Sequence, residues 1–396
     1  MNKEVTITET KANPIVLQSV PDRIYFDNAA TTALDKEVLD AMLPYMTDHY
    51  GNPSSVYSYG RETRLAIENA RKSVAKNVGV KPGAIFFTSG GTESNNTAIA
   101  ASIRDLGCNH IITSAIEHHA VLHTVLHYSE DKNISFNFVA LQDDGHIDLQ
   151  NLETLLQQNT AAGKKCLVSL MQANNEIGIL LPIKTVGELC TKYNAVFHSD
   201  CVQTVGHYPI NLSEISVHFI SAASHKFHGP KGVGILYVNE EINIRPFIFG
   251  GGQERNMRAG TENVYGIVGF AKALEIAMRD CEKESAAIKE LKLYMAAALQ
   301  NAFDGVSFNC GADALYTVLS VCFPKTDKAE FLLMNLDING ICASGGSACS
   351  SGADAGSHVM KALQKNDDQV TVRFSFSKYN TKQEVDRVVE KLKELL

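Results

Sequence analysis

The sequence predicts an α/β protein whose mostly parallel sheet is covered by helices on both faces. Short apolar runs alternate with helical patterns from about residue 62 onward, which is the order that strand–helix–strand units produce. The apolar runs read as buried strands, as expected of strands that helices cover on both sides. Polar clusters follow several of these runs directly, and sheets of this class bind ligands at the carboxyl ends of their strands.

The elements follow one another regularly along the chain. Residues 61–78 (RETRLAIENARKSVAKNV) place Ala66, Ala70, Val74 and Val78 four apart, which predicts one face of a helix. The run AIFFTSG at 84–90 predicts a buried strand that ends in glycine. Further strands are predicted at 110–114, 134–141, 165–171, 195–200, 217–224 and 232–238, and further helices at 120–128, 148–157 and 183–193.

The character of the chain changes after about residue 265. Residues 266–303 read as one long helical segment, either continuous or broken, and the remainder mixes strands and helices. A chain of 396 residues with 45% hydrophobic residues can bury a large core in two domains. We therefore expect a large domain over 33–281 and a smaller α/β domain formed by 1–32 together with 282–396.

Composition excludes several classes of protein. The formal net charge of −8 gives no general attraction for nucleic acid or an anionic membrane. No stretch approaches the roughly 20 apolar residues of a membrane span, and the N-terminus lacks the apolar core of a signal peptide. The nine cysteines include no C-x-x-C pair, so no metal site is expected. These features predict a soluble cytoplasmic protein with no nucleic-acid or membrane partner.

Two residues at predicted strand ends suit one cofactor. Lys226 follows an apolar strand directly, where partial desolvation favours a neutral amine that can form a Schiff base. Asp200 ends the run AVFHSD, and Gln203 follows three residues later. Pyridoxal phosphate needs a lysine for its aldehyde and an acid for its ring nitrogen, and Gln203 could bond the ring hydroxyl. A surface lysine in a glycine-rich turn and a helix N-cap aspartate are the alternatives.

A phosphate site and a proton carrier complete this set. In FTSGGTESNNTAI a strand, a glycine pair, Thr92 and Ser94 lead into a helical run, so that backbone N–H groups and a helix N-terminus can face an anion. Such a turn is often only a turn. His118 lies at another strand end and could stack on the cofactor ring and move protons near neutral pH, or could simply be a capping or buried histidine.

Taken together, these motifs resemble the group I cysteine desulfurases of the NifS/IscS type, within the fold-type I, class V aminotransferase-like enzymes. The similarity extends from Tyr25 to about Lys393. It is carried, in this order, by DNAATT, GNPSSVYSYGRE, FTSGGTESNN, EHHAVL, NNEIG, HSDCVQTVG, SHKFHGPKGVG, GGGQERNMRAGTEN, SGGSACSSG and VRFSFS. The resemblance implies the fold of this class, with a large, mostly parallel seven-stranded sheet, and pyridoxal 5'-phosphate as cofactor.

The resemblance also implies a role for each matching residue. Lys226 would form the Schiff base, Asp200 would pair with the ring nitrogen, Gln203 would contact the ring oxygen, and His118 would stack on the ring and assist proton transfer. The phosphate would be held by Gly91, Thr92, Ser224 and His225, and Thr261 would reach the phosphate of a neighbouring subunit in a homodimer. Asn175, also a cofactor contact, and Arg373 would hold the substrate carboxylate, for which the planar guanidinium fork is suited. An ion pair within the small domain is the alternative for Arg373.

Cys349, in the soft loop SGGSACSSG, matches the persulfide-forming cysteine of the family. A loop rich in glycine and serine is flexible, so the thiol of Cys349 could move, and exposure to solvent would keep it available for reaction. The implied reaction converts L-cysteine to L-alanine and leaves a persulfide on Cys349. A sulfur-acceptor protein, such as an iron–sulfur scaffold or a sulfur carrier for tRNA and cofactor thiolation, would then take the sulfur. A selenocysteine lyase and a class V aminotransferase without a mobile thiol are the alternative functions. The alternative for Cys349 itself is an incidental exposed thiol without a role in catalysis.

The sequence departs from the family pattern at a few positions. Ala223 stands where many relatives have a phosphate-binding serine, and we expect Ser224 to compensate. Cys201 replaces a usual alanine beside Asp200. The chain ends at KELL, whereas scaffold-binding relatives often continue, which puts that particular partner in doubt. The arm before Tyr25 is longer than usual and has no assigned role.

Overall fold

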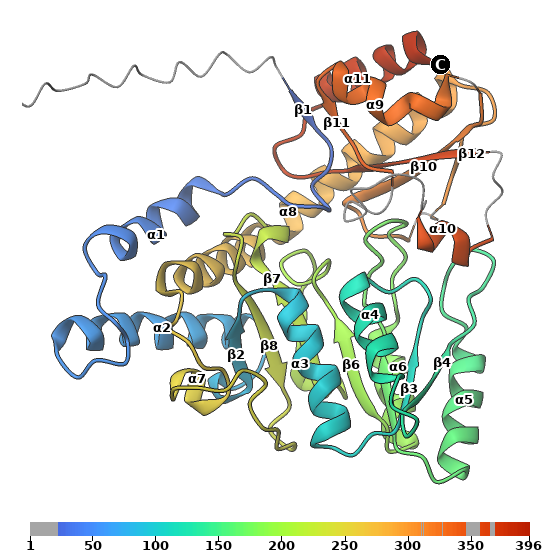
Figure 1. The fold of residues 1–396 in the computed structure, drawn as a ribbon. Coiled ribbons are helices and arrows are strands. Elements are labelled where there is room, and N and C mark those ends of the chain that lie inside the picture. Colours follow the sequence, from blue (N-terminus) through green and yellow to red (C-terminus); the bar gives the residue numbers. More distant parts are fainter. Residues whose placement is uncertain (1–22, 310, 312, 327, 346–356, 365–368) are drawn as a thin grey trace, which may run out of the picture.

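The central feature of the structure is a seven-stranded sheet (Figure 1). The computed structural model describes residues 23–309, 311, 313–326, 328–345, 357–364 and 369–396. The sheet has the order β2-β8-β7-β6-β5-β3-β4. Its strands are β2 (Ile85–Thr88), β3 (His110–Thr113), β4 (Ser135–Phe138), β5 (Cys166–Ser169), β6 (Val196–Asp200), β7 (Phe219–Ala223) and β8 (Gly234–Val238). The five neighbouring strands β4, β3, β5, β6 and β7 are parallel to one another. Strand β8 pairs antiparallel with β7, and β2 pairs antiparallel with β8. The predicted mostly parallel sheet is confirmed.

Helices cover both faces of this sheet. They are α1 (Lys36–Thr47), α2 (Ser58–Asn77), α3 (Gly91–Arg104), α4 (His119–Tyr128), α5 (Leu149–Ala161), α6 (Ile183–Lys192), the short α7 (Gln253–Asn256) and α8 (Val264–Ala302). Single 3-10 turns lie at η1 (Pro82–Ala84), η2 (Leu212–Glu214) and η3 (Ser224–Lys226). The long helix predicted over 266–303 is therefore one unbroken helix, α8, of 39 residues.

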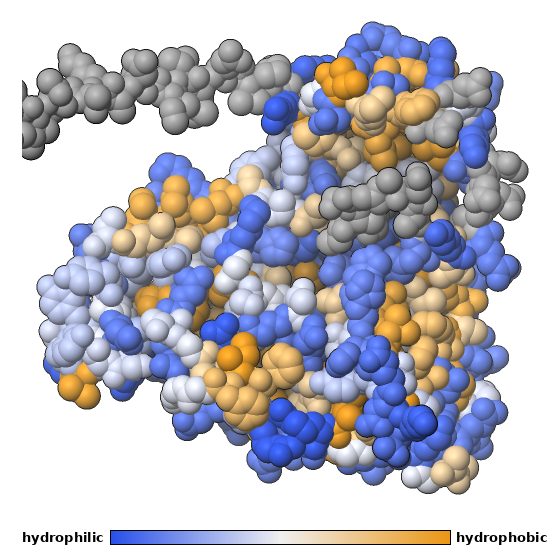
Figure 2. All heavy atoms as spheres, viewed as in Figure 1, coloured by the Kyte–Doolittle hydropathy of each residue, from blue (hydrophilic) through white to orange (hydrophobic). Residues whose placement is uncertain are grey.

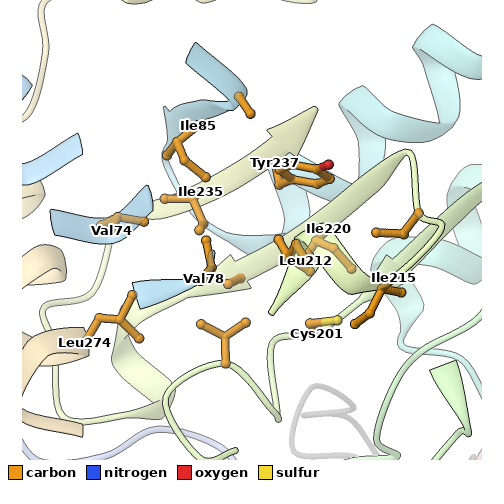
Figure 3. Packing of buried hydrophobic residues seen from close by; sticks show 14 of the residues in the cluster. Val74, Val78, Ile85, Cys201, Leu212, Ile215, Ile220, Ile235, Tyr237 and Leu274 are labelled. Carbon is orange, nitrogen blue, oxygen red and sulfur yellow. The ribbon is translucent and has the colours of Figure 1, made fainter. Parts of the chain in front are cut away.

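Successive strand residues point to opposite faces, and two hydrophobic clusters result. Ile111 and Leu167 pack with α3 and α4, whereas Ile112 and Val168 pack with α2, α5, α6 and α8. Figure 3 shows the second cluster from close by, where side chains of α2, β2, β7 and β8 meet. Because both faces are apolar, the strands read as continuous hydrophobic runs in the sequence.

A third hydrophobic cluster lies around a smaller sheet of the order β12-β10-β9. The remaining elements are β1 (Ile24–Tyr25), β9 (Ser307–Phe308), β10 (Val318–Pro324), η4 (Ala329–Phe331), α9 (Leu332–Ile338), β11 (Ile341–Cys342), α10 (His358–Ala362), β12 (Gln369–Ser375) and α11 (Lys382–Leu395). Strand β1 pairs in parallel with β11, so Ile24 and Tyr25 join this part of the molecule.

Helix α8 connects the two parts. Its buried residues up to Ile276 belong to the large-sheet cluster, and those from Ile288 onward belong to the cluster of the smaller sheet. The predicted boundary between residues 281 and 282 falls between these two sets, and the two-domain division stays a prediction. Among the described helices, none combines the length and the apolar character that a membrane crossing would need.

Candidate active site

The sequence-predicted residues meet in a cavity of about 380 Å³ beyond the carboxyl ends of the central strands. Strands β5, β6 and β7 end at this edge of the sheet, so the segments that follow them converge there. The lining includes Ala29, Gly91, Thr92, Asn95, His118, His119, Asn175, Glu176, Asp200, Gln203, Ala223, His225, Lys226, His358 and Arg373. Both parts of the molecule therefore contribute to one site.

The N-terminus of α3 forms one end of the cavity. Gly90 is the N-cap with φ of 152°, a conformation that favours glycine. A Cβ atom on Gly91 would lie 2.7 Å from Val202, so only glycine fits at this close approach. The backbone N–H groups of a helix start attract an anion. Burial, and to a smaller extent the nearby Lys226 and Lys231, lowers the pKa of His225 to about 4. Its neutral ring has one N–H group that can donate a hydrogen bond to an anion here.

Asp200 forms the floor of the cavity at the end of β6, where it is 5% exposed. Its Oδ1 accepts from the backbone N–H of Val202 at 2.9 Å, and its Oδ2 accepts from Nδ2 of Asn95 at 2.6 Å. Asn95 is buried, and its Oδ1 has no hydrogen-bond partner. Sequence reasoning missed Asn95, although its position four residues after Gly91 places it on the same face of α3.

Lys226 ends the 3-10 turn after β7 and reaches into the cavity. Its Nζ donates to the backbone carbonyls of Ala29 and Ala30, at 2.6 and 2.8 Å. The side-chain amide of Gln203 donates to the same carbonyl of Ala29 at 3.0 Å. The segment DNAATT is thus folded against the lysine turn, which explains why two motifs separated by 197 residues, counted from Ala29 to Lys226, belong to one site.

His118 is the N-cap of α4 and also lines the cavity. Its Nδ1 accepts from the backbone N–H of Ala120 at 3.1 Å, so the ring proton of the neutral form is on Nε2. Burial lowers the pKa of His118, with Asp200 acting in the opposite direction. The capping role and the cavity position, which were alternatives in the sequence, coexist in the structure.

Arg373 of β12 lines the cavity, with its side chain 1% exposed. Its Nη1 donates to the carbonyl of Asn175 at 2.9 Å, and its Nη2 lies 2.6 Å from Oδ1 of Asp27. Both interpretations of Arg373, the cavity cation and the ion-pair partner, therefore describe the same side chain. A buried guanidinium beside open space is suited to a carboxylate ligand.

Two further cavity residues were not assigned from the sequence. Glu176, in the motif NNEIG, is 2% exposed, and burial raises the pKa of its carboxyl group. It accepts a hydrogen bond from Ser357, the N-cap of α10. The next residue, His358, approaches the carbonyl of Glu117 with Nε2 at 2.9 Å. Helix α10 is thereby attached to the large sheet. The polar cluster around residue 174 gave a signal for Glu176, whereas His358 had none.

The structure places two of the predicted residues outside this cavity. Ser224 is fully buried and donates its hydroxyl to the carbonyl of Pro230, so it does not compensate for Ala223, which lines the cavity. Thr261 lies in a separate pocket with Ser89, Glu254 and Arg258. Cys349 lies outside the described residues.

Cys201 turns away from the cavity as well. It is fully buried, and Figure 3 shows it among apolar side chains near Ile215. Burial raises the pKa of its thiol to about 12, so it is a core residue and not a second reactive thiol.

The described residues suit pyridoxal phosphate as a cofactor. The cavity offers an amine, a buried carboxylate with an unpartnered amide oxygen beside it, an imidazole and a helix N-terminus for an anion. Thus the fold and the site define the class of the protein as a fold-type I enzyme that uses this cofactor.

The comparisons narrow this class. The family model for aminotransferase class V matches residues 24–388. A cysteine desulfurase IscS of Dictyoglomus turgidum is 41% identical over 382 residues, covering 93% of this chain and 95% of that protein. A solved NifS-like protein is 38% identical with a TM-score of 0.85, covering 94% of this chain and 98% of its own. A second, SspA in complex with cysteine, is 31% identical with a TM-score of 0.78, over 90% and 100% of the two chains. The chain belongs to the class V aminotransferase family and, within it, to the cysteine desulfurases.

Proposed function

We propose that this enzyme converts L-cysteine to L-alanine and transfers the sulfur to the thiol of Cys349 as a persulfide. The observation that carries this proposal is the meeting of Lys226, Asp200, His118 and Arg373 around one cavity. The sulfur would supply iron–sulfur cluster assembly or the thiolation of cofactors and tRNA. No observation favours a selenocysteine lyase or an aminotransferase over this reaction.

The cavity residues would divide the work of holding the cofactor. Lys226 would bind the aldehyde carbon, Asp200 would face the ring nitrogen, and Gln203 would face the ring oxygen. Gly91, Thr92 and His225 would hold the phosphate at the start of α3, where backbone N–H groups are already oriented. When bound, pyridoxal phosphate supplies an electron sink for a substrate carbanion.

Substrate would be oriented by its carboxylate. Arg373 and Asn175 both line the cavity, and the guanidinium fork can bind a carboxylate with two parallel hydrogen bonds. His118 is held by Ala120 so that it offers an N–H and not a lone pair. We infer that His118 donates a proton to the substrate side, while the Lys226 amine takes and returns the proton at the α carbon.

The sulfur step needs a thiolate on Cys349. The thiolate sulfur attacks the sulfur of the substrate, an S–S bond forms, and the C–S bond of the substrate breaks. The electron pair of that C–S bond stays with the substrate carbon, which takes up a proton and leaves as L-alanine. Cys349 is left as a persulfide, so one cysteine gives one alanine and one transferable sulfur atom.

The test compares Cys349→Ser with the matched variant Cys342→Ser during turnover of L-cysteine with a reductant. We expect Cys349→Ser to lose alanine and sulfide formation and Cys342→Ser to keep it. Alanine formation by Cys349→Ser at the wild-type rate would contradict the role of Cys349, and activity confined to selenocysteine would contradict the substrate. Borohydride should fix the cofactor to wild-type protein and not to Lys226→Ala.

We also propose a homodimer. Helix α1 carries an exposed apolar stripe of Leu39, Leu43 and Met46, which are 39%, 44% and 50% exposed. Tyr50, Val56 and Tyr57 continue it at 73%, 85% and 60%, and Figure 2 shows apolar surface over α1. A contiguous apolar patch of this kind is typical of a protein interface. A second copy of the chain would cover the patch and bring its Thr261 to the phosphate end of the neighbouring site.

Sedimentation of the holoenzyme tests the dimer. The double variant Leu43→Glu/Met46→Glu should sediment as a monomer, because two charges would be buried without partners at the interface. Leu293→Glu, at a residue of α8 that is 52% exposed, is the matched control and should remain dimeric. A dimeric double variant would place the interface elsewhere.

A surface for the sulfur acceptor is proposed on α9. Phe331, Met334 and Ile338 are 54%, 56% and 72% exposed and lie three and four residues apart, on one helical face. The side chain of the neighbouring Leu333 lies against Gly345, which precedes Cys349 by four residues in the sequence. After loading with radiolabelled cysteine, Met334→Glu should pass less label to proteins of a cell extract than wild type does. Equal transfer would exclude this surface, and label that reaches no other protein from either variant would favour simple sulfide release.

A further inference from the structure

A histidine behind the lysine turn connects Lys226 to the smaller part of the molecule. His207 lies in the segment that follows β6, in a second cavity that shares Lys226 and Gln203 with the first. The half-buried ring of His207 approaches the backbone carbonyl of Lys226 with Nε2 at 3.0 Å. A carbonyl oxygen only accepts, so Nε2 carries the ring proton and donates it.

The other side of this histidine faces Tyr316, which precedes β10 of the smaller sheet. The Tyr316 hydroxyl donates to the carbonyl of His207 at 3.0 Å and lies 3.3 Å from its Nδ1. The two rings meet edge to face with centroids 5.9 Å apart. Hydrogen bonds and ring contact therefore fix the imidazole from both sides.

The backbone around His207 is fitted to the lysine turn. Gly206 has φ of 83°, and a Cβ atom there would lie 2.4 Å from the ring of Phe227. Only glycine permits this approach, so the segment that carries His207 packs directly on the turn that carries Lys226. Burial lowers the pKa of His207 to about 4, which keeps the ring neutral at pH 7 and its donor nitrogen constant.

Lys226 is consequently held at two points. Its Nζ is bonded to the carbonyls of Ala29 and Ala30, and its own carbonyl is bonded to His207. Without His207 the carbonyl would be left without this donor, and the 3-10 turn would lose one of the hydrogen bonds that set the lysine relative to Asp200. None of the residues proposed to bind cofactor or substrate donates this hydrogen bond to the carbonyl of Lys226.

We propose that His207 is a positioning residue for Lys226, whose orientation it couples to Tyr316 of the smaller domain; this rests on the proposed role of Lys226 as the cofactor lysine. The interaction is a hydrogen bond from the neutral imidazole N–H of His207 to the backbone carbonyl of Lys226. His207 touches neither cofactor nor substrate, so it acts on the reaction only through the lysine turn.

The experiment measures how firmly the cofactor is held in holoenzyme variants. The readouts are visible circular dichroism of the bound cofactor and the rate at which hydroxylamine removes it. His207→Ala should lower the dichroism and release the cofactor about tenfold faster, because a buried carbonyl loses its donor. His207→Gln, which keeps a neutral N–H donor, should restore most of the wild-type behaviour, and Tyr316→Phe should give a smaller change in the same direction.

His218→Ala is the matched control. His218 is also a half-buried histidine bonded to backbone, since its Nδ1 accepts from Phe197 N–H at 3.0 Å, but it lies at the opposite end of β7. This variant should lower thermal stability without changing either cofactor readout. If His207→Ala behaves in the same way, or if His207→Gln fails to rescue it, His207 has only a structural role. A Lys226→Ala protein that borohydride still fixes to the cofactor would instead refute the proposed lysine, which separates the two failures.

Discussion

An isosteric substitution that breaks the buried ion pair between Arg71 and Glu254 should strongly destabilise the protein. Arg71 of α2 and Glu254 of α7 have side chains only 2% and 3% exposed, and their Nη2 and Oε1 atoms lie 2.8 Å apart. Glu254 also accepts from Nη1 of Arg71 and from the backbone N–H of Phe87, each at 2.8 Å. Burial alone would lower the pKa of Arg71, but the carboxylate of Glu254 raises it above its ordinary value.

Glu254→Gln keeps the shape of the side chain and removes the charge. Removing one member of a buried pair costs about 3–5 kcal/mol, because the other charge stays buried and uncompensated. Glu68 lies 3.1 Å from Nε of Arg71 but is 43% exposed, so it offsets little of this cost and we expect about 3 kcal/mol. Chemical denaturation of the holoenzyme measures the change in the free energy of unfolding.

The double variant Arg71→Met/Glu254→Gln isolates the charge effect. It should be more stable than Glu254→Gln alone, because it removes the orphaned guanidinium as well. Glu214→Gln, which breaks the exposed pair with Lys184 at the same distance of 2.8 Å, should leave the midpoint unchanged. A cost below about 1 kcal/mol for Glu254→Gln would refute the reasoning, since it would show that water reaches Arg71.

Three further substitutions test the site. Burial raises the pKa of Glu117 from 4.5 to about 8, so the contribution of this carboxyl group to stability is complete below pH 4.5 and is lost as the pH rises through 8. Thermal melts should therefore show Glu117→Gln to be more stable than wild type at pH 9 and not at pH 5. Equal dependence of the melting temperature on pH in the two proteins would contradict this. Asn95→Ala removes the 2.6 Å donor to Asp200 and should weaken cofactor binding about tenfold with a change in its visible spectrum, whereas the remote Asn77→Ala should change neither. Ala223→Ser adds a hydroxyl to the cavity lining and should tighten cofactor binding by about tenfold or more, because one hydrogen bond to a charged group is worth roughly 1.5 kcal/mol or more; weaker binding would mean that the hydroxyl clashes.

The fold and most of the residues that line the cavity were predictable because they follow from local patterns. Continuous apolar runs identified β3, β5, β6 and β7, and the residues after β6 and β7 had to meet at one sheet edge. The antiparallel addition of β8 and β2 could not be read from these runs, since strand direction depends on how the chain returns.

The missed contacts have a different origin. The hydroxyl of Ser224 could serve the cavity or its own turn, and only the position of the Pro230 carbonyl decides for the turn. His207 and Tyr316 are 109 residues apart, and no local pattern relates them. Their meeting depends on how the smaller sheet is placed against the large one, which is a property of tertiary packing.

The ion pair between Arg373 and Asp27 leads to a prediction about substrate affinity. Asp27 lies 2.6 Å from its guanidinium and is 18% exposed, so a substrate carboxylate would enter a site that already holds one negative charge. Asp27→Asn keeps an oxygen that accepts from Nη2 and removes the charge. At a separation of roughly 6 Å and an effective dielectric constant of about 20, one such repulsion is worth up to about 3 kcal/mol, or up to roughly a hundredfold in affinity. The expected outcome is a lower KM for L-cysteine with kcat little changed, because the interaction concerns binding and not the sulfur step. Asp40→Asn, at an exposed residue paired with Lys36, is the control and should change neither constant. If Asp27→Asn raises KM, then Asp27 serves mainly to hold the guanidinium in place, and its charge does not oppose the substrate.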